Sequence, residues 1–250
     1  AVPLERTTQG GWVCDPAAIE AAVTPRTRAL FINTPSNPTG WTADRETLSA
    51  ILEIARRHGL WIIADEIYAL FCYGERRAAS FLDVADPEDR LIYVNTFSKN
   101  WAMTGWRMGW LKVHPSLQQV FENLVQYSTS GVPQFLQRGG VAALNEGDAF
   151  LAGQAEQAGG CRDALVDRLI ATGRVKAAPP QGAFYLFFEI DGVTDTKSAA
   201  LRIVDEANVG LAPGTAFGPG GEGFFRACFH RRLDLVEEAG DRLARWISAL

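Results

Sequence analysis

The sequence is sparing in the residues that mark disulfide frameworks, metal sites and membrane spans. Its 250 residues include 4 cysteines and 3 histidines. The cysteines stand far apart without a C-x-x-C pair, which favours free thiols in a reducing, cytoplasmic compartment. The histidines show no metal-ligand spacing, so we expect no metal site. The longest apolar runs, such as residues 60–64, are too short to cross a bilayer, so we expect no membrane partner.

Strong charge of one sign is also missing. The formal net charge is −5 and the sequence contains no run of basic residues, which argues against nucleic acid as a partner. Hydrophobic residues make up 47% of the chain, an ordinary share for a globular protein, and the length can bury one large core or two modest ones. The chain opens without an initiator Met or a signal-peptide pattern and reads as though it begins inside a domain.

The first 145 or so residues alternate strand and helix signals. Short apolar runs predict strands at 28–32, 60–64, 91–95 and 106–113. Alternation of this kind predicts an α/β fold with a mostly parallel sheet and helices on both faces. The expected helices in this part are a short one capped by Asp15, and longer ones over 42–58, 115–127 and 133–145.

The texture of the sequence changes after Gly147. A long polar helix, roughly 148–171, leads into a shorter alternation of strands and helices, which predicts a smaller α+β domain. We therefore divide the chain into a large domain, 1–147, and a small C-terminal domain, 148–250. The small domain is expected to hold strands near 175, 184–189 and 223–229, a helix over 198–207, and a final helix with Leu235, Ala239, Leu243, Trp246 and Ile247 on one face.

Polar residues of distinct chemistry follow three of the predicted strands. Ligands of open parallel sheets bind beyond the carboxyl ends of the strands, so these residues indicate one site built from several loops. Each has an ordinary alternative when taken alone: Asn37 can belong to a turn and Asp65 can cap a helix. Likewise, Tyr68 can be a core aromatic and Lys99 a solvated lysine. The set comprises Asn33 and Asn37, then Asp65 and Tyr68, then Thr96, Ser98 and Lys99.

Two cations stand in aromatic and apolar surroundings within TFSKNWAMTGWRMGW, residues 96–110. Lys99 directly follows a predicted strand, and Arg107 lies between Trp106 and Trp110. Positive charges are costly in such surroundings unless they meet an anion or a reactive group, although Arg107 can also pair with a surface acid.

Four motifs resemble one enzyme family in their order and spacing. NTPSNPTG (33–40), ADEIY (64–68), TFSKNWAMTGWR (96–107) and FFRACF (224–229) are similar to the class I/II aminotransferases, pyridoxal-phosphate enzymes of fold type I. PQGAFYLF (180–187) extends the likeness, which covers essentially the whole chain. Any one of these motifs is weak, but four in order are specific. The resemblance implies the pyridoxal-phosphate transferase large domain followed by the family's small domain.

The resemblance assigns roles around the cofactor ring. It implies that Lys99 forms the Schiff base with pyridoxal 5′-phosphate, since a deprotonated lysine amine is nucleophilic. Asp65 matches the carboxylate that pairs with the pyridine nitrogen and keeps the ring an electron sink; its neighbour Glu66 is a rival that the D-E-x-Y pattern disfavours. Asn37 and Tyr68 match the donors to the phenolic oxygen of the cofactor.

The resemblance also assigns anion-binding residues. Arg226, among Phe224, Phe225 and Phe229, matches the arginine that clamps the substrate α-carboxylate, with Asn37 beside it; the alternative is an exposed edge-strand position. The expected ligands of the cofactor phosphate are Thr96, Ser98 and Arg107, with Ser98 the least secure.

The implied activity is ping-pong transamination between an L-amino acid and a 2-oxo acid, with Lys99 as general base and then general acid. Carbon–sulfur β-lyase chemistry, a non-catalytic regulatory domain and an inert fragment stay open as alternatives.

The family also implies a homodimer, in which residues 128–130 could reach the neighbouring site. It further implies an N-terminal stretch with a Gly-rich phosphate loop and a ring-stacking aromatic, and nothing before residue 33 matches these. A piece of a longer enzyme is therefore favoured over a truncated product.

Overall fold

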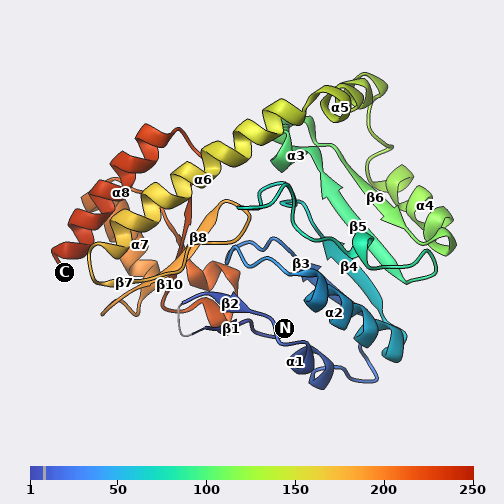
Figure 1. The fold of residues 1–250 in the computed structure, drawn as a ribbon, viewed down its shortest axis with the longest axis horizontal. Coiled ribbons are helices and arrows are strands. Elements are labelled where there is room, and N and C mark those ends of the chain that lie inside the picture. The colour runs from blue at the N-terminus through green and yellow to red at the C-terminus, as the bar shows by residue number, and fades with distance from the viewer. Residues whose placement is uncertain (8–9) are drawn as a thin grey trace.

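The computed structural model describes residues 1–7 and 10–250 and contains two four-stranded sheets (Figure 1). The long helix α6 (Asp148–Ile170) runs from the first sheet toward the second. The N-terminal half of α6 is largely exposed, whereas its C-terminal half packs on α8 (Leu233–Ser248) beside the second sheet. The two sheets are therefore joined by a single continuous helix as well as by the loop contacts described below.

The first sheet has the spatial order β3-β4-β5-β6. Strands β3 (Ala29–Asn33), β4 (Trp61–Asp65) and β5 (Leu91–Thr96) are parallel, and β6 (Gly109–Val113) is antiparallel to β5. The predicted α/β fold with a mostly parallel sheet is confirmed. The parallel register pairs Asn33 with Asp65, so the carboxyl ends of these strands lie side by side.

The helices around the first sheet begin and end where the sequence provides caps. The Asp44 side chain accepts a hydrogen bond from the Thr47 amide at 2.7 Å, so α2 begins at Arg45 rather than at the predicted residue 42. Gly59 ends α2 in the left-handed conformation, with φ of 62°. The helices of this part are α1 (Pro16–Ala21), α2 (Arg45–His58), α3 (Phe97–Asn100), α4 (Gln118–Ser128) and α5 (Gln134–Glu146), with 3₁₀ turns at Phe81–Asp83, Thr104–Trp106 and Pro115–Leu117.

The predicted start of the fourth strand was wrong. The strand was expected from residue 106, but the 3₁₀ turn Thr104–Trp106 occupies that place and β6 begins at Gly109. Arg107 follows the turn with φ of 53°, a left-handed conformation that cannot continue into a strand. The close approach of β6 to β5 also requires Gly109, because a Cβ there would lie 2.7 Å from the Asn95 carbonyl oxygen.

The second sheet has the order β7-β8-β10-β9, and every pairing in it is antiparallel. Phe188 on β8 and Phe225 on β10 are fully buried. Side chains alternate along a strand, so Phe187 lies on the other face, where its ring centroid is 5.9 Å from that of Trp12. The elements are β7 (Val175–Lys176), β8 (Tyr185–Ile190), β9 (Ala212–Pro213), β10 (Phe224–Cys228) and α7 (Thr196–Ala207), with 3₁₀ turns at Gly214–Phe217 and Pro219–Gly221.

The hairpin that begins the chain lies beside this second sheet (Figure 1). Its strands are β1 (Glu5–Arg6) and β2 (Trp12–Val13). Arg6 forms an ion pair with Glu189 of β8, and its guanidinium lies over the Trp12 ring. The hairpin therefore covers the face of the second sheet that α6 and α8 leave open.

The predicted face of α8 is buried over the C-terminal half of the helix, but the prediction was wrong at Leu235. Leu243, Trp246 and Ile247 are buried as expected, but Leu235 is 48% exposed and Val236 is buried in its stead. The contact centres on Gly240, where an added Cβ would meet the Arg168 side chain of α6 at 2.9 Å. This close approach turns Leu235 toward solvent.

Two hydrophobic clusters fill the molecule. One surrounds the first sheet and holds Ile51, Ile62 and Phe81. The other surrounds the second sheet and α6, and it also takes in Tyr68 and Phe71 from the loop after β4.

The division of the chain into two domains after residue 147 stays a prediction. Within residues 1–7 and 10–250, no helix is long and apolar enough to cross a membrane, and no three His, Cys, Asp or Glu side chains gather as a metal-binding group.

Candidate active site

The loops that follow β3 and β4 are fixed to each other at the carboxyl edge of the first sheet. The side-chain nitrogen Nδ2 of Asn33 donates to the backbone carbonyl oxygen of Asp65 at 3.1 Å. The side-chain oxygen Oδ1 of Asn33 accepts from the backbone amide of Asn37 at 2.8 Å. A short polar residue can bond the backbone in this way at the start of a loop. The result places Asn37 beside the end of β4.

The second sheet contributes Arg226 to the same place. Its guanidinium Nη1 donates to Asn37 Oδ1 at 3.0 Å. The guanidinium carbon lies 4.4 Å from the Tyr185 ring centroid and 4.7 Å from that of Phe217, so the cation is held between two aromatic faces. Its Nε is buried and has no partner among the described residues. Since a guanidinium carries five N–H donors, most of them remain for an anion.

Tyr68 joins this group from the loop after β4. Its hydroxyl lies 3.2 Å from the hydroxyl of Tyr185, and the Lys99 amine lies 5.9 Å from the centroid of its ring. Burial raises the pKa of Tyr68. Tyr68 is therefore a neutral phenol, able to donate one hydrogen bond.

Asp65 lies at the end of β4 with its carboxylate partly buried. Among the described residues its side chain accepts a single hydrogen bond, a long one of 3.4 Å from the Ile67 amide, and burial raises the pKa of the carboxyl group. Across residues 1–7 and 10–250 it has no ion-pair partner within 4.0 Å. A carboxylate in this condition is suited to a cationic ligand group.

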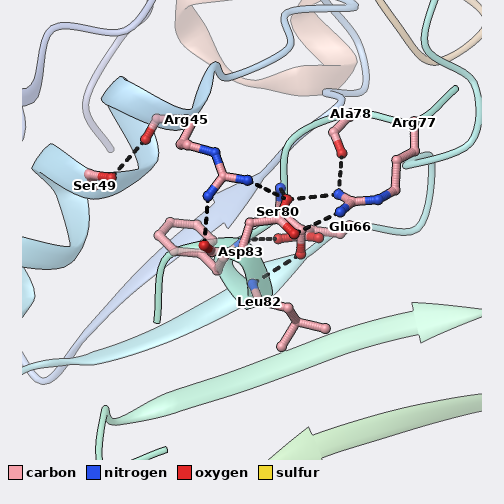
Figure 2. A network of polar contacts seen from close by, with 9 residues as sticks. Arg45, Ser49, Glu66, Arg77, Ala78, Ser80, Leu82 and Asp83 are labelled. Carbon is pink, nitrogen blue, oxygen red and sulfur yellow. Dashed lines mark hydrogen bonds and ion pairs between the residues drawn. The ribbon is translucent and has the colours of Figure 1, made fainter. Parts of the chain in front are cut away.

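Glu66, the rival of Asp65, is occupied elsewhere (Figure 2). Its side chain is 1% exposed, and its Oε1 accepts from the Phe81 amide at 2.8 Å. The same turn is closed by the Asp83 carboxylate, which accepts from the Ser80 amide at 3.0 Å and pairs with Arg77. Glu66 is thus bound to the turn at residues 80–83, which agrees with the preference for Asp65 as the ring partner.

The three residues expected to bind phosphate line one cavity of about 1080 Å³. The Thr96 hydroxyl donates its only proton to the Met108 carbonyl at 2.9 Å, and its oxygen caps α3 by accepting from the Ser98 amide at 3.1 Å. The Arg107 guanidinium is exposed and donates to the Thr104 carbonyl at 2.9 Å. In this arrangement Arg107 and Ser98 are better placed than Thr96 to offer donors to an anion.

Three cations among the predicted site residues have no carboxylate partner within the part of the chain that the structure describes. Among the residues that the structure describes, no Asp or Glu oxygen lies within 4.0 Å of a side-chain nitrogen of Lys99, Arg107 or Arg226. Many of the other arginines do form such pairs, Arg56 and Arg168 among them. The arrangement leaves these three positive charges for external anions.

Two contact residues were not found by sequence reasoning. Tyr185 lies within the motif at 180–187, but its contact with Tyr68 spans 117 positions along the chain. Phe217 lies in a 3₁₀ turn with no polar signal. Thr129 and Ser130 line the cavity that contains Arg107, and the predicted reach of residues 128–130 toward a partner subunit stays a prediction.

Comparison with known proteins identifies the family. The sequence profile of "Aminotransferase class I and II" matches residues 1–243. The chain is 32% identical to an aspartate aminotransferase of Thermotoga maritima, over 92% of this chain and 59% of that protein. It is also 32% identical to an LL-diaminopimelate aminotransferase of Desulforudis audaxviator, over 96% and 61%. The crystal structure of an aromatic aminotransferase from Pyrococcus horikoshii superposes with a TM-score of 0.89 at 32% identity, over 94% of this chain and 64% of that one.

The chain therefore belongs to the class I and II aminotransferase family. It spans about three fifths of the length of the relatives that it matches. These relatives are named for aspartate, LL-diaminopimelate and aromatic substrates, so the family membership by itself selects none of them.

Proposed function

We propose that the protein containing this chain is a pyridoxal-phosphate-dependent aminotransferase that moves an amino group between an L-amino acid and a 2-oxo acid. The observation that supports it best is the meeting of Lys99, Tyr68, Asn37 and Arg226 from four separated segments of the chain. Structural needs explain each residue singly, but they do not explain an amine, a phenol, an amide and an unpaired guanidinium in one place.

The residues present fit the cofactor. Asp65 is a partly buried carboxylate without a cation, which suits a protonated pyridine nitrogen. Because Asn37 Oδ1 accepts from Arg226, its amide nitrogen is left to donate, and Tyr68 adds a second donor for a phenolic oxygen. Ser98 and Arg107 supply donors for a phosphate, with Thr96 beside them. When bound, the cofactor supplies the electron sink that the removal of a proton from an amino acid α-carbon requires.

The chain's own residues divide the remaining work. The Lys99 amine would take up the α-carbon proton as base and return it as acid, because it is the side-chain amine that lies beside Tyr68. Arg226 binds the substrate carboxylate with the N–H groups that Asn37 does not use, and the two aromatic rings keep its plane fixed. Asp65 would pair with the protonated pyridine nitrogen of the bound cofactor, which would keep the electron sink effective.

The test uses the four lysines of the chain. Pyridoxal 5′-phosphate is added to the purified protein, the visible absorbance is recorded, and borohydride reduction is followed by peptide mapping. We expect the label on Lys99 and not on Lys112, Lys176 or Lys197. Lys99→Ala should lose the absorbance, whereas the matched control Lys112→Ala, on β6, should keep it.

Substrate assays then separate the reaction classes. Amino-group exchange that depends on an added 2-oxo acid supports the aminotransferase. Release of pyruvate and ammonia from a cysteine conjugate would instead establish the β-lyase, and a colourless protein, or label spread over all four lysines, would contradict the proposed cofactor site.

Assembly and location are part of the same proposal. A cytoplasmic homodimer agrees with the cysteine usage and with the exposed apolar side chains on α4 and α5. Tyr127 is 88% exposed and Phe135 is 73% exposed, and such surfaces on helices usually meet further polypeptide. Analytical ultracentrifugation measures the assembly directly.

A further inference from the structure

Tyr185 contacts two residues of the proposed site from one position on β8. Its hydroxyl lies 3.2 Å from the Tyr68 hydroxyl, and its ring centroid lies 4.4 Å from the Arg226 guanidinium carbon. The side chain is 7% exposed. It therefore lies between the residue expected to face the cofactor oxygen and the residue expected to face the substrate carboxylate.

The strand register explains how one residue reaches both. Tyr185 is paired with Cys228, and Arg226 is two residues away from Cys228 on β10. Residues two apart on a strand share a face, so Arg226 lies diagonally across from Tyr185 on the same face of the sheet. The adjacent residue Phe184 packs edge-on against Tyr68, with ring centroids 5.2 Å apart, and this contact holds Tyr68 against the start of β8.

A count of protons fixes the direction of the bond between the two phenols. A phenol hydroxyl has one proton to donate. If Tyr68 donates that proton to the cofactor oxygen, it can only accept from Tyr185. A hydroxyl that accepts a hydrogen bond becomes a stronger donor in turn, so Tyr185 strengthens the donation by Tyr68.

We propose that Tyr185 is a positioning residue of this site: its hydroxyl orients and strengthens the Tyr68 hydroxyl, and its ring supports the Arg226 guanidinium. The inference rests on the proposed function, since it concerns the same cofactor and substrate. The two parts of the side chain have separate effects, because the hydroxyl acts on the cofactor half of the site and the ring acts on the carboxylate half.

Two substitutions separate these parts. Tyr185→Phe removes only the hydroxyl, and we expect it to raise the pH midpoint of the visible absorbance of the protein loaded with pyridoxal 5′-phosphate by about half a unit. Its KM for amino acid should change little, because the ring stays beneath Arg226. Tyr185→Leu removes the ring as well, and it should raise KM about tenfold or more, as expected when a cation loses its aromatic support.

Tyr73 provides a matched control. Its hydroxyl donates to the Ala183 carbonyl at 2.7 Å in a partly buried position, and its ring centroid lies 4.4 Å from the Arg162 guanidinium carbon, so it repeats the geometry of Tyr185 without contacting the site. Tyr73→Phe should leave the absorbance midpoint and KM unchanged. The double variant Tyr68→Phe/Tyr185→Phe should shift the midpoint no further than Tyr68→Phe alone, because the Tyr185 hydroxyl acts through Tyr68.

The outcomes distinguish the two proposals. If the unsubstituted protein gains no visible absorbance with pyridoxal 5′-phosphate, the proposed function fails and the role of Tyr185 fails with it. If the absorbance appears but Tyr185→Phe titrates like the unsubstituted protein, the function stands and the Tyr185 inference is overturned. The inference is also overturned if Tyr73→Phe shifts the midpoint as much, or if the two site substitutions add independently.

Discussion

Replacing Glu66 with glutamine tests how the polar turn behind the site responds to pH. The Glu66 carboxyl is 1% exposed, accepts one hydrogen bond from the Phe81 amide, and has its second oxygen buried without a partner among the described residues. Burial raises its pKa from 4.5 to about 7, with the nearby Asp83 adding to the increase and Arg77 opposing it. Glutamine has nearly the same shape and no charge, so Glu66→Gln removes the titration and keeps the acceptor (Figure 2).

The size and sign follow from the two pKa values. In the unfolded chain the group loses its proton near pH 4.5, but in the folded chain it keeps the proton until about pH 7. Between these values the unfolded state binds fewer protons, so the free energy of unfolding falls as pH rises. At about 1.4 kcal/mol per pH unit, the loss reaches about 3 kcal/mol above pH 8. The free energy of unfolding of Glu66→Gln should not fall with pH in this way. The buried side-chain NH₂ of the new glutamine has no acceptor among the described residues, which lowers the free energy of unfolding by about 1 to 3 kcal/mol at every pH.

Urea denaturation of the two proteins at intervals from pH 4 to pH 8, followed by tryptophan fluorescence, measures the effect. The difference in free energy of unfolding, unsubstituted minus variant, should fall by about 3 kcal/mol across this range. Glu156→Gln, at an exposed position on α6, is the control and should give a flat difference. Parallel curves for the unsubstituted protein and Glu66→Gln would refute the reasoning, since they would mean that Glu66 titrates alike in the folded and unfolded chains.

Two further predictions concern packing, and the same denaturation measurements at fixed pH test both. Gly40→Ala should destabilise the fold by about 2 to 4 kcal/mol, because φ there is +68° and the new Cβ would collide with Pro180. Gly74→Ala, at φ of +100° in open space, should lose only the stability that the backbone conformation costs, about 1 kcal/mol. Equal losses of stability in the two variants would contradict the collision with Pro180. Phe188→Ala should cost about 3 to 5 kcal/mol because the ring is fully buried. Leu201→Ala, at a 63% exposed position on α7, should cost little, and a small effect at both positions would mean that the second core tolerates the cavity.

The local elements were predictable where the sequence carries its own stop signals. Asp44 and Gly59 limit α2 to within three residues of the prediction, because a cap and a left-handed glycine act on the backbone next to them. The antiparallel direction of β6 was not predictable, because the turn before it has no distinctive composition. The error at Leu235 of α8 has a similar cause: Gly240 looks like a weak helix position, and only its packing against Arg168 shows that it is a contact point with α6.

The residues of the candidate site also differ in how far the sequence alone could predict them. Lys99, Asp65 and Tyr68 could be named as candidates from the sequence because each stands at or after the end of a strand, and strand ends meet at one edge of a parallel sheet. Arg226 became a candidate only through the family resemblance, since its own strand gives no sign of which sheet it faces. Tyr185 was not found at all, because an aromatic residue in a strand is normally a packing residue and its polar partner is remote in sequence.

The division of the site between two sheets sets what its chemistry depends on. The amine, the phenol and the amide come from loops of the first sheet, whereas the guanidinium that we propose binds the substrate carboxylate comes from the second. The distance between them is therefore set by how the second sheet packs on those loops. That packing is fixed by backbone bonds, from the Gly182 amide to the Gly40 carbonyl at 3.1 Å and from the Ala183 amide to the Phe71 carbonyl at 2.8 Å. Because Tyr185 follows Ala183 by two residues, the segment that joins the sheets also carries the side chain that connects their functional groups.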